Sequence, residues 1–182
     1  MLTSKQEESL SEFMSKNLRH TPEQYGVELD HEGFCHIHDL IKGIKSENKW
    51  SEIADSDILQ VVENCPKQRY EIINGYIRAN YGHSAGRLEY KESTPPAVLY
   101  HGTNTKVVDK ILLEGIKPMG RKYVHLSEGL EFATLAGKRR GELVILNVDT
   151  VESAANHVKF YVAKHGVWLA DYVPPQYLSV KR

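Results

Sequence analysis

The chain has 182 residues, a formal net charge of −1 at pH 7, and 41% hydrophobic and 26% charged residues. These values are ordinary for a globular protein, and no apolar run approaches the ~20 residues that a membrane helix needs. The first residues also lack the apolar core of a secretory signal. We therefore expect a cytoplasmic protein without a membrane segment, built from one domain or two small ones.

The two cysteines, Cys35 and Cys65, are too few and too isolated for a disulfide framework or a zinc site. We expect both to be buried thiols in a reducing compartment. The nine histidines are dispersed along the chain, so the sequence predicts no metal site.

Charge divides the chain into two unequal halves. Residues 1–92 carry 11 Lys and Arg against 16 Asp and Glu, whereas residues 93–182 carry 12 against 8. Because no general basic field is present, a nucleic acid would have to be held by a local cluster of cations. The polar stretch before Pro95-Pro96 predicts a boundary there, which gives domains 1–92 and 93–182.

The first half is predicted to be helical and then to form a hairpin. Residues 4–18 read as a helix, in which Ser4 and Glu7 have the spacing of a capping box. Apolar spacing predicts two further helices, around residues 37–44 and 58–62. Residues 69–73 and 76–80 flank Asn74-Gly75, which is typical of a β-hairpin with a type I′ turn. Helices followed by a two-stranded wing resemble a winged-helix module.

The second half is predicted to be a lobe of short strands and a few helices. Strands are expected at residues 98–101, 123–127, 143–148, 159–162 and 166–169, and helices at 107–112 and 131–138. This order lacks regular βαβ units, so we expect an α+β fold. Neither GxGxxG nor GxxxxGK[ST] occurs, which argues against Rossmann and P-loop nucleotide binding.

One set of candidate residues is cationic. Arg19 and His20 end the first predicted helix, Arg69 begins the hairpin, and Arg121 lies in a predicted loop. Each has a simple structural explanation, since a cation at a helix C-terminus is worth roughly 0.3–1 kcal/mol and the others suit a strand end or a surface turn. If they converge, however, three arginines and a histidine suit a dianionic phosphate, which arginine's planar fork can hold through two oxygens.

A second set contains His101 and His125, each on a predicted strand beside small or hydroxyl residues, Gly102-Thr103 and Ser127. A lone histidine on a strand is more often a satisfied core residue than a functional one. Together the two sets suggest an enzyme that joins a phosphorylated substrate to a cofactor between two lobes.

At several places the chain resembles the RNA 2′-phosphotransferases of the KptA type. The resemblance runs from about residue 10 to 178 and is carried by an ordered series of motifs: Leu18-Arg19-His20 with Pro22, Asp30-x-x-Gly33-Phe34, Asp39-Leu40, Lys67-Gln68-Arg69-Tyr70, Ile77-Arg78-Ala79, Gly82-His83-Ser84, Pro95-Pro96, Leu99-Tyr100-His101-Gly102-Thr103, Tyr123-Val124-His125-Leu126-Ser127 and Gly166-Val167-Trp168-Leu169. No single motif is decisive, but the ordered set is specific. One departure is visible, because Tyr81 stands where the family usually has glutamine.

The resemblance implies a winged-helix-like RNA lobe followed by an ADP-ribosyltransferase-like lobe that binds NAD. It also implies removal of an internal RNA 2′-phosphate, such as tRNA splicing leaves, by its transfer to NAD. NAD is then consumed as a co-substrate, without a metal, and the products are nicotinamide and ADP-ribose 1″,2″-cyclic phosphate. The intermediate is an RNA–phospho–ADP-ribose adduct. We expect the protein to act as a monomer.

The same resemblance assigns roles to residues. It implies that the RNA phosphate is bound by Arg19, His20 and Arg69, with His83 and Ser84 as further RNA contacts. Arg121 is expected to stabilise the second step, with Arg139 or Arg140 as the competitor. It implies an NAD site formed by Tyr100, His101, Gly102, Thr103, His125, Leu126 and Ser127.

Two other classes stay open. An ADP-ribosyltransferase that acts on another phosphate, nucleic acid or protein acceptor would share His101 and His125, but it would leave Arg19 and Arg69 without a role. A winged-helix RNA-binding protein without catalysis would explain only the first half. Consumption of NAD distinguishes these classes from one another.

Overall fold

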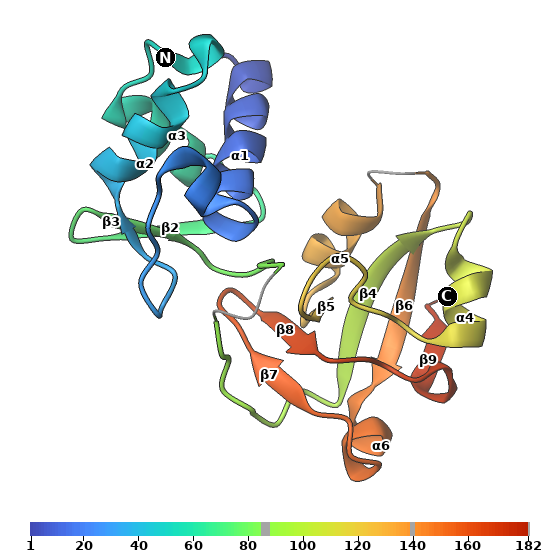
Figure 1. Ribbon diagram of the computed structural model, residues 1–182. Helices are drawn as coiled ribbons and strands as arrows, with labels where there is room; N and C mark the ends of the chain where they lie inside the picture. The colour runs from blue at the N-terminus through green and yellow to red at the C-terminus, as the bar shows by residue number, and fades with distance from the viewer. Residues whose placement is uncertain (85–87, 139–140, 182) are drawn as a thin grey trace. The chain divides into compact units, whose positions relative to one another are not determined.

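The computed structural model describes residues 1–84, 88–138 and 141–181, and its two compact units comprise Met1–Glu89 and Tyr90–Arg182 (Figure 1). The described residues form six α-helices and two separate antiparallel sheets, so the mixed α and β composition expected from the sequence is confirmed. No helix in the described part of the chain is both long and apolar enough to cross a membrane.

Unit 1 packs three helices over a small sheet (Figure 1). Its elements are α1 (Ser4–Arg19), η1 (Pro22–Tyr25), β1 (Cys35–His36), α2 (Ile37–Lys45), η2 (Asn48–Trp50), α3 (Asp55–Glu63), β2 (Tyr70–Ile73) and β3 (Tyr76–Ala79). The strand order is β1-β3-β2. Leu10, Met14 and Leu18 of α1 are fully buried, as their helical spacing predicts.

The hairpin β2–β3 has the predicted turn. Asn74 and Gly75 have φ angles of +51° and +81°, and both central positions of a type I′ turn require such positive values. Tyr70 pairs with Ala79 at the other end of the hairpin. The turn therefore sets the register in which β2 and β3 pair.

The N-terminal cap of α1 differs from the expected one. Thr3, not Ser4, is the capping residue, and its backbone and side chain form a capping box with Gln6. Both pairs share the required spacing, so spacing alone could not separate them. Glu7 is used elsewhere, because its carboxylate accepts hydrogen bonds from side chains of α3 and the residue after it, Gln60 and Asn64.

Unit 2 is a six-stranded antiparallel sheet of order β7-β8-β5-β4-β6-β9 with helices against it. Its elements are β4 (Val98–Asn104), α4 (Val108–Glu114), β5 (Val124–Ser127), α5 (Leu130–Gly137), β6 (Leu143–Asp149), α6 (Thr150–Ala155), β7 (Phe160–Val162), β8 (Val167–Ala170), η4 (Pro175–Tyr177) and β9 (Leu178–Val180). The sequence did not predict β1, α6 or β9, which are short and carry little apolar periodicity. A separate core forms around Leu99, Leu126 and Phe160.

The middle of this sheet is only partly paired. β4 pairs with β6 from Val98 to Asn104, and β5 pairs with β8 from Val124 to Ser127. Between β4 and β5 themselves, the described strands pair only at Tyr100 and Ser127. Beyond this pair the described residues of β4 and β5 are not paired with each other, and this unpaired stretch, called the gap below, includes the predicted NAD residues His101, Gly102 and His125.

Candidate active site

Unit 1 brings the end of α1, the start of β2 and the segment after β3 together. Arg19 is the last residue of α1 and only 8% exposed, and its guanidinium carbon lies 6.0 Å from the ring centroid of Tyr70. The backbone N–H of Ser84 donates to the carbonyl oxygen of Arg19 at 3.2 Å, and the N–H of Asn80 donates to that of Arg69 at 2.7 Å. The predicted phosphate-binding residues of this unit therefore share one region, although the sequence spreads them from 19 to 84.

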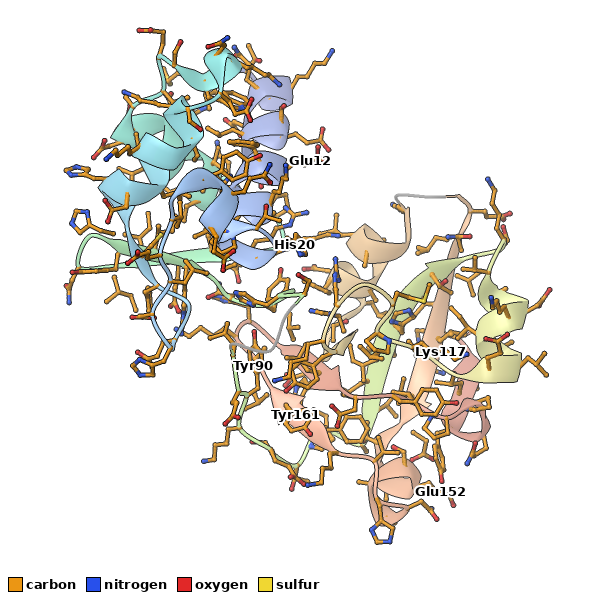
Figure 2. The ribbon with its side chains drawn as sticks, in the orientation of Figure 1. Glu12, His20, Tyr90, Lys117, Glu152 and Tyr161 are labelled. Carbon is orange, nitrogen blue, oxygen red and sulfur yellow. The ribbon has the colours of Figure 1, made fainter. Side chains whose placement is uncertain are left out.

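His20 and Arg69 differ from Arg19 in exposure. His20, labelled in Figure 2, caps the end of α1 and is exposed. Arg69 is half-buried, and its Nη1 donates to the sulfur of Cys65 at 3.4 Å.

Cys65 and Cys35 are both buried free thiols, as predicted, and burial raises the pKa of Cys35 to about 12.

His83 is a buried histidine in this region. It is 8% exposed, and neither ring nitrogen has a hydrogen-bond partner among the described residues. Burial, with further contributions from Arg19, His20 and Arg78, lowers the pKa of His83 to about 4. The imidazole is consequently neutral near pH 7, with one nitrogen able to donate and the other able to accept.

Unit 2 positions the two predicted histidines on the strands that part. The Nδ1–H of His101 donates to the backbone carbonyl oxygen of His125 at 3.1 Å, where a continuous ladder would have backbone bonds. Because a carbonyl can only accept, this bond leaves Nε2 of His101 as an acceptor. Burial lowers the pKa of His101, and the bond to His125 opposes that shift.

Gly102 has a clear packing role. A Cβ at this position would lie 1.7 Å from the carbonyl oxygen of Ala133 in α5, so only glycine lets α5 pack on β4. A Cβ on Gly137 would in turn lie 2.7 Å from the carbonyl oxygen of Thr103. The residues of β4 that border the gap are thus covered by α5.

The other predicted NAD residues differ in what they contact. Leu126 is 1% exposed and packs in the core, so its side chain supports the sheet. Ser127 is also 1% exposed, and its hydroxyl donates to the carbonyl oxygen of Gly129 at 2.8 Å. Tyr100 is half-buried with the ammonium of Lys181 over its ring, at 5.5 Å from the centroid.

Arg121 is exposed in the turn that its backbone N–H closes on the carbonyl oxygen of Pro118. Its competitors Arg139 and Arg140 lie outside the described residues.

The structure adds an aromatic group that the sequence did not indicate. The ring centroid of Tyr123 lies 5.8 Å from that of Tyr90 and 5.2 Å from that of Tyr161, both labelled in Figure 2.

The described residues contain no cluster of three or more His, Cys, Asp or Glu side chains that suits a metal ion. A hollow of about 500 Å³ in unit 2 is lined by Asn147, Asp149, Glu152 and neighbouring residues. It contains none of the predicted site residues and has no cluster of cations.

Comparison with known proteins gives a consistent result. The sequence model of a family of transferases, described as "RNA 2′-phosphotransferase, Tpt1 / KptA family", matches residues 5–172. A protein of Acetivibrio thermocellus named "Probable RNA 2′-phosphotransferase" is 43% identical over 171 residues, which cover 93% of this chain and 94% of the relative. Proteins with the same name from Rhizobium leguminosarum bv. trifolii and Bacillus thuringiensis subsp. konkukian are 42% and 36% identical, over 98% and 96% of this chain and 97% and 95% of their own. The chain belongs to the RNA 2′-phosphotransferase family, as the motifs indicated.

Proposed function

We propose that this protein removes an internal 2′-phosphate from RNA and transfers it to NAD, giving nicotinamide and ADP-ribose 1″,2″-cyclic phosphate. The family match carries the proposal, because it extends over nearly the whole chain and through both units. Residues 1–92 then act as a winged-helix-like RNA lobe and residues 93–182 as an ADP-ribosyltransferase-like lobe. The protein acts as a monomer in the cytoplasm, where RNA and NAD both occur.

The proposed phosphate site is the region of unit 1 around Arg19. Arg19, His20 and Arg69 hold the 2′-phosphate, and His83 and Ser84 contact the adjoining RNA. The nearness of these residues at the end of α1 supports this assignment. Since unit 1 is acidic overall, RNA is bound by this small cluster of cations and not by a wide basic surface. We therefore expect RNA affinity to depend only weakly on RNA length.

The proposed NAD site is the gap between β4 and β5. Nε2 of His101 is fixed as an acceptor and suits a ribose hydroxyl. Backbone groups of Gly102 and Thr103 and the side chain of His125 border the same gap, while Tyr100, Leu126 and Ser127 support it. The residues present therefore fit a nucleotide that is bound mainly through hydrogen bonds.

The reaction has two steps. A 2′-phosphate oxygen attacks C1″ of the nicotinamide ribose, and nicotinamide leaves with the electrons of the broken C–N bond. The ribose 2″-hydroxyl then attacks phosphorus, and the RNA leaves with a free 2′-hydroxyl. Arg19 and Arg69 orient the phosphate and offset the charge that gathers on it, and Arg121 stabilises the second transition state. His20 carries a proton in these steps, since histidine titrates near neutrality.

The experiment that tests this function is a metal-free incubation with NAD and a short RNA that carries one internal 2′-phosphate, followed by mass analysis. We expect loss of the phosphate with one ADP-ribose 1″,2″-cyclic phosphate and one nicotinamide per RNA. The same RNA without the 2′-phosphate is the control and should leave NAD intact. Consumption of NAD without dephosphorylation would favour another acceptor, and absence of any turnover from folded protein would contradict catalysis.

A further inference from the structure

The guanidinium of Arg19 is enclosed by two tyrosines and a glycine. Its central carbon lies 5.3 Å from the ring centroid of Tyr81 and 6.0 Å from that of Tyr70. A Cβ on Gly82 would lie 3.1 Å from Nη1, so the backbone at residue 82 also borders the group. Both tyrosines are 4% exposed, so these neighbours are themselves held by packing. An arginine restrained in this way loses little further conformational freedom when it binds an anion.

The other end of Tyr81 reaches the turn that precedes Arg69. The hydroxyl of Tyr81 donates to the carbonyl oxygen of Lys67. The neighbouring residue Asn80 donates from its side chain to the carbonyl oxygen of Gln68 at 2.9 Å. Gln68 has a φ of +42°, a conformation that a residue with a side chain rarely adopts and that the surrounding bonds maintain. Residues 80 and 81 therefore hold the turn from which Arg69 extends.

The hydroxyl of Tyr81 stays protonated over the whole physiological range. Burial raises its pKa well above the usual value, while the positive charges of Arg19 and Arg69 oppose the shift. Both arginines are close enough to act on Tyr81, because its ring lies beside Arg19 and its hydroxyl beside the turn that precedes Arg69. The hydroxyl can consequently serve as a constant donor to Lys67.

We propose that Tyr81 is a positioning residue for phosphate binding: its ring fixes the guanidinium of Arg19, and its hydroxyl fixes the turn that carries Arg69. This role rests on the proposed function, in which the two arginines hold one RNA 2′-phosphate. A residue without an aromatic ring at position 81 could not make this contact with Arg19.

Two substitutions separate the two contacts. Tyr81→Phe keeps the ring and removes the hydroxyl, and Tyr81→Leu removes both. The readout is the dissociation constant for a short RNA with one internal 2′-phosphate, measured without NAD and compared with that of the same RNA without the phosphate. We expect the phosphate-dependent affinity to fall ~3–10-fold for Tyr81→Phe, in line with one lost hydrogen bond. For Tyr81→Leu we expect a fall of ~10–100-fold, since a misplaced binding group can cost that much.

Tyr25 offers a matched control in the same unit. The ammonium of Lys16 lies 5.1 Å from its ring centroid and donates to its hydroxyl at 2.8 Å, so Tyr25 also has a cation beside its ring and a hydrogen-bonded hydroxyl, although this hydroxyl accepts the bond. No proposed site residue takes part in them. Tyr25→Phe and Tyr25→Leu should leave the phosphate-dependent affinity within about 2-fold of the wild type, because their effect is on packing within unit 1 and not on the two arginines.

Double substitutions show whether Tyr81 acts through the arginines. In an Arg19→Ala background, Tyr81→Leu should weaken phosphate-dependent binding by much less than it does in the wild type. In an Arg69→Ala background, Tyr81→Phe should likewise have little further effect. Effects that simply multiply would mean independent actions and would overturn the positioning role. Urea unfolding is measured for every variant, and if Tyr81→Leu does not fold, the pair Tyr81→Phe and Arg69→Ala still decides the question.

The positioning role and the proposed function fail in different ways. Wild-type protein that binds both RNAs equally and leaves NAD unchanged would contradict the proposed function, whatever the variants do. Wild-type protein that favours the 2′-phosphorylated RNA and removes its phosphate, with Tyr81 variants that match it, would overturn only the role of Tyr81.

Discussion

The side chain of His101 bonds to the main chain of His125, so one predicted site histidine fixes the other strand through its backbone. The distance from Nδ1 to the carbonyl oxygen is 3.1 Å, and the bond lies where β4 and β5 stop pairing. The imidazole thus links the two halves of the sheet at this point. It also determines which ring nitrogen can meet a ligand.

Replacing His101 by alanine should weaken the use of NAD. Loss of the Nε2 acceptor leaves a ribose hydroxyl without its partner, which typically costs about 1–3 kcal/mol. We expect the KM for NAD to rise by about one to two orders of magnitude, since 1.4 kcal/mol corresponds to a factor of about ten. Steady-state kinetics with either substrate varied will check this, with His157→Asn as an exposed control in the same unit. An equal rise in the KM for RNA would speak against a site specific to NAD.

Replacing Arg121 by alanine should separate the two chemical steps. Loss of a charge-stabilising group typically slows a step ~10²–10³-fold, and here only the second step is expected to suffer. The RNA–phospho–ADP-ribose adduct should therefore accumulate, and rapid quenching followed by mass analysis will detect it. Arg139→Ala and Arg140→Ala serve as the comparison. Accumulation in one of these variants, but not in Arg121→Ala, would transfer the role to that residue.

Replacing Gly102 by alanine should destabilise unit 2. The new Cβ would lie 1.7 Å from the carbonyl oxygen of Ala133, so α5 must move away from β4. Overpacking commonly costs about 1–3 kcal/mol, and a clash with backbone puts this case at the upper end or beyond. Urea unfolding followed by the fluorescence of Trp168, with Trp50 replaced by phenylalanine, will measure the change. Gly120→Ala is the control, because a Cβ there has no neighbour within 4 Å.

The burial of His83 predicts sensitivity to acid. Its pKa falls from the usual 6.5 to about 4 on folding, so the unfolded chain binds more protons between these values. The stability that this group contributes is complete above pH 6.5 and is lost as the pH falls toward 4, by at most about 3 kcal/mol. His83→Gln should therefore flatten the decline of unfolding free energy with falling pH. Urea titrations at several pH values will show it, and a decline as steep as that of the exposed His31→Gln control would contradict the prediction.

Much of the fold follows from local pattern. The burial of Leu10, Met14 and Leu18 follows from helical spacing, and the positive φ angles of Asn74 and Gly75 follow from turn chemistry. Where two local solutions share one spacing, as at Thr3 and Ser4, pattern could not decide between them. The short helix α6 was missed because its buried residues, Thr150 and Ser153, are polar.

The site was less predictable than the fold, because its geometry depends on contacts between distant segments. The motifs identified Arg19 and Arg69. They did not show that the side chain of Tyr81 lies beside Arg19 and bonds to the turn that precedes Arg69. The sequence marked Tyr81 only as a departure from the family's pattern. Likewise, the sequence shows that residue 102 is a glycine but not why a glycine is needed there. The need comes from the backbone of α5, which lies some thirty residues later in the chain and packs directly on Gly102.

The parting of β4 from β5 has a consequence for how such proteins can diverge. A sheet opened at its centre offers amide and carbonyl groups of the main chain, which every amino acid carries. A ligand bound through these groups would tolerate change in most of the surrounding side chains, provided that a contact such as that of His101 with the carbonyl of His125 holds the two strands in place. Distant relatives could then be found more readily by the spacing of two neighbouring strands than by alignment of their side chains.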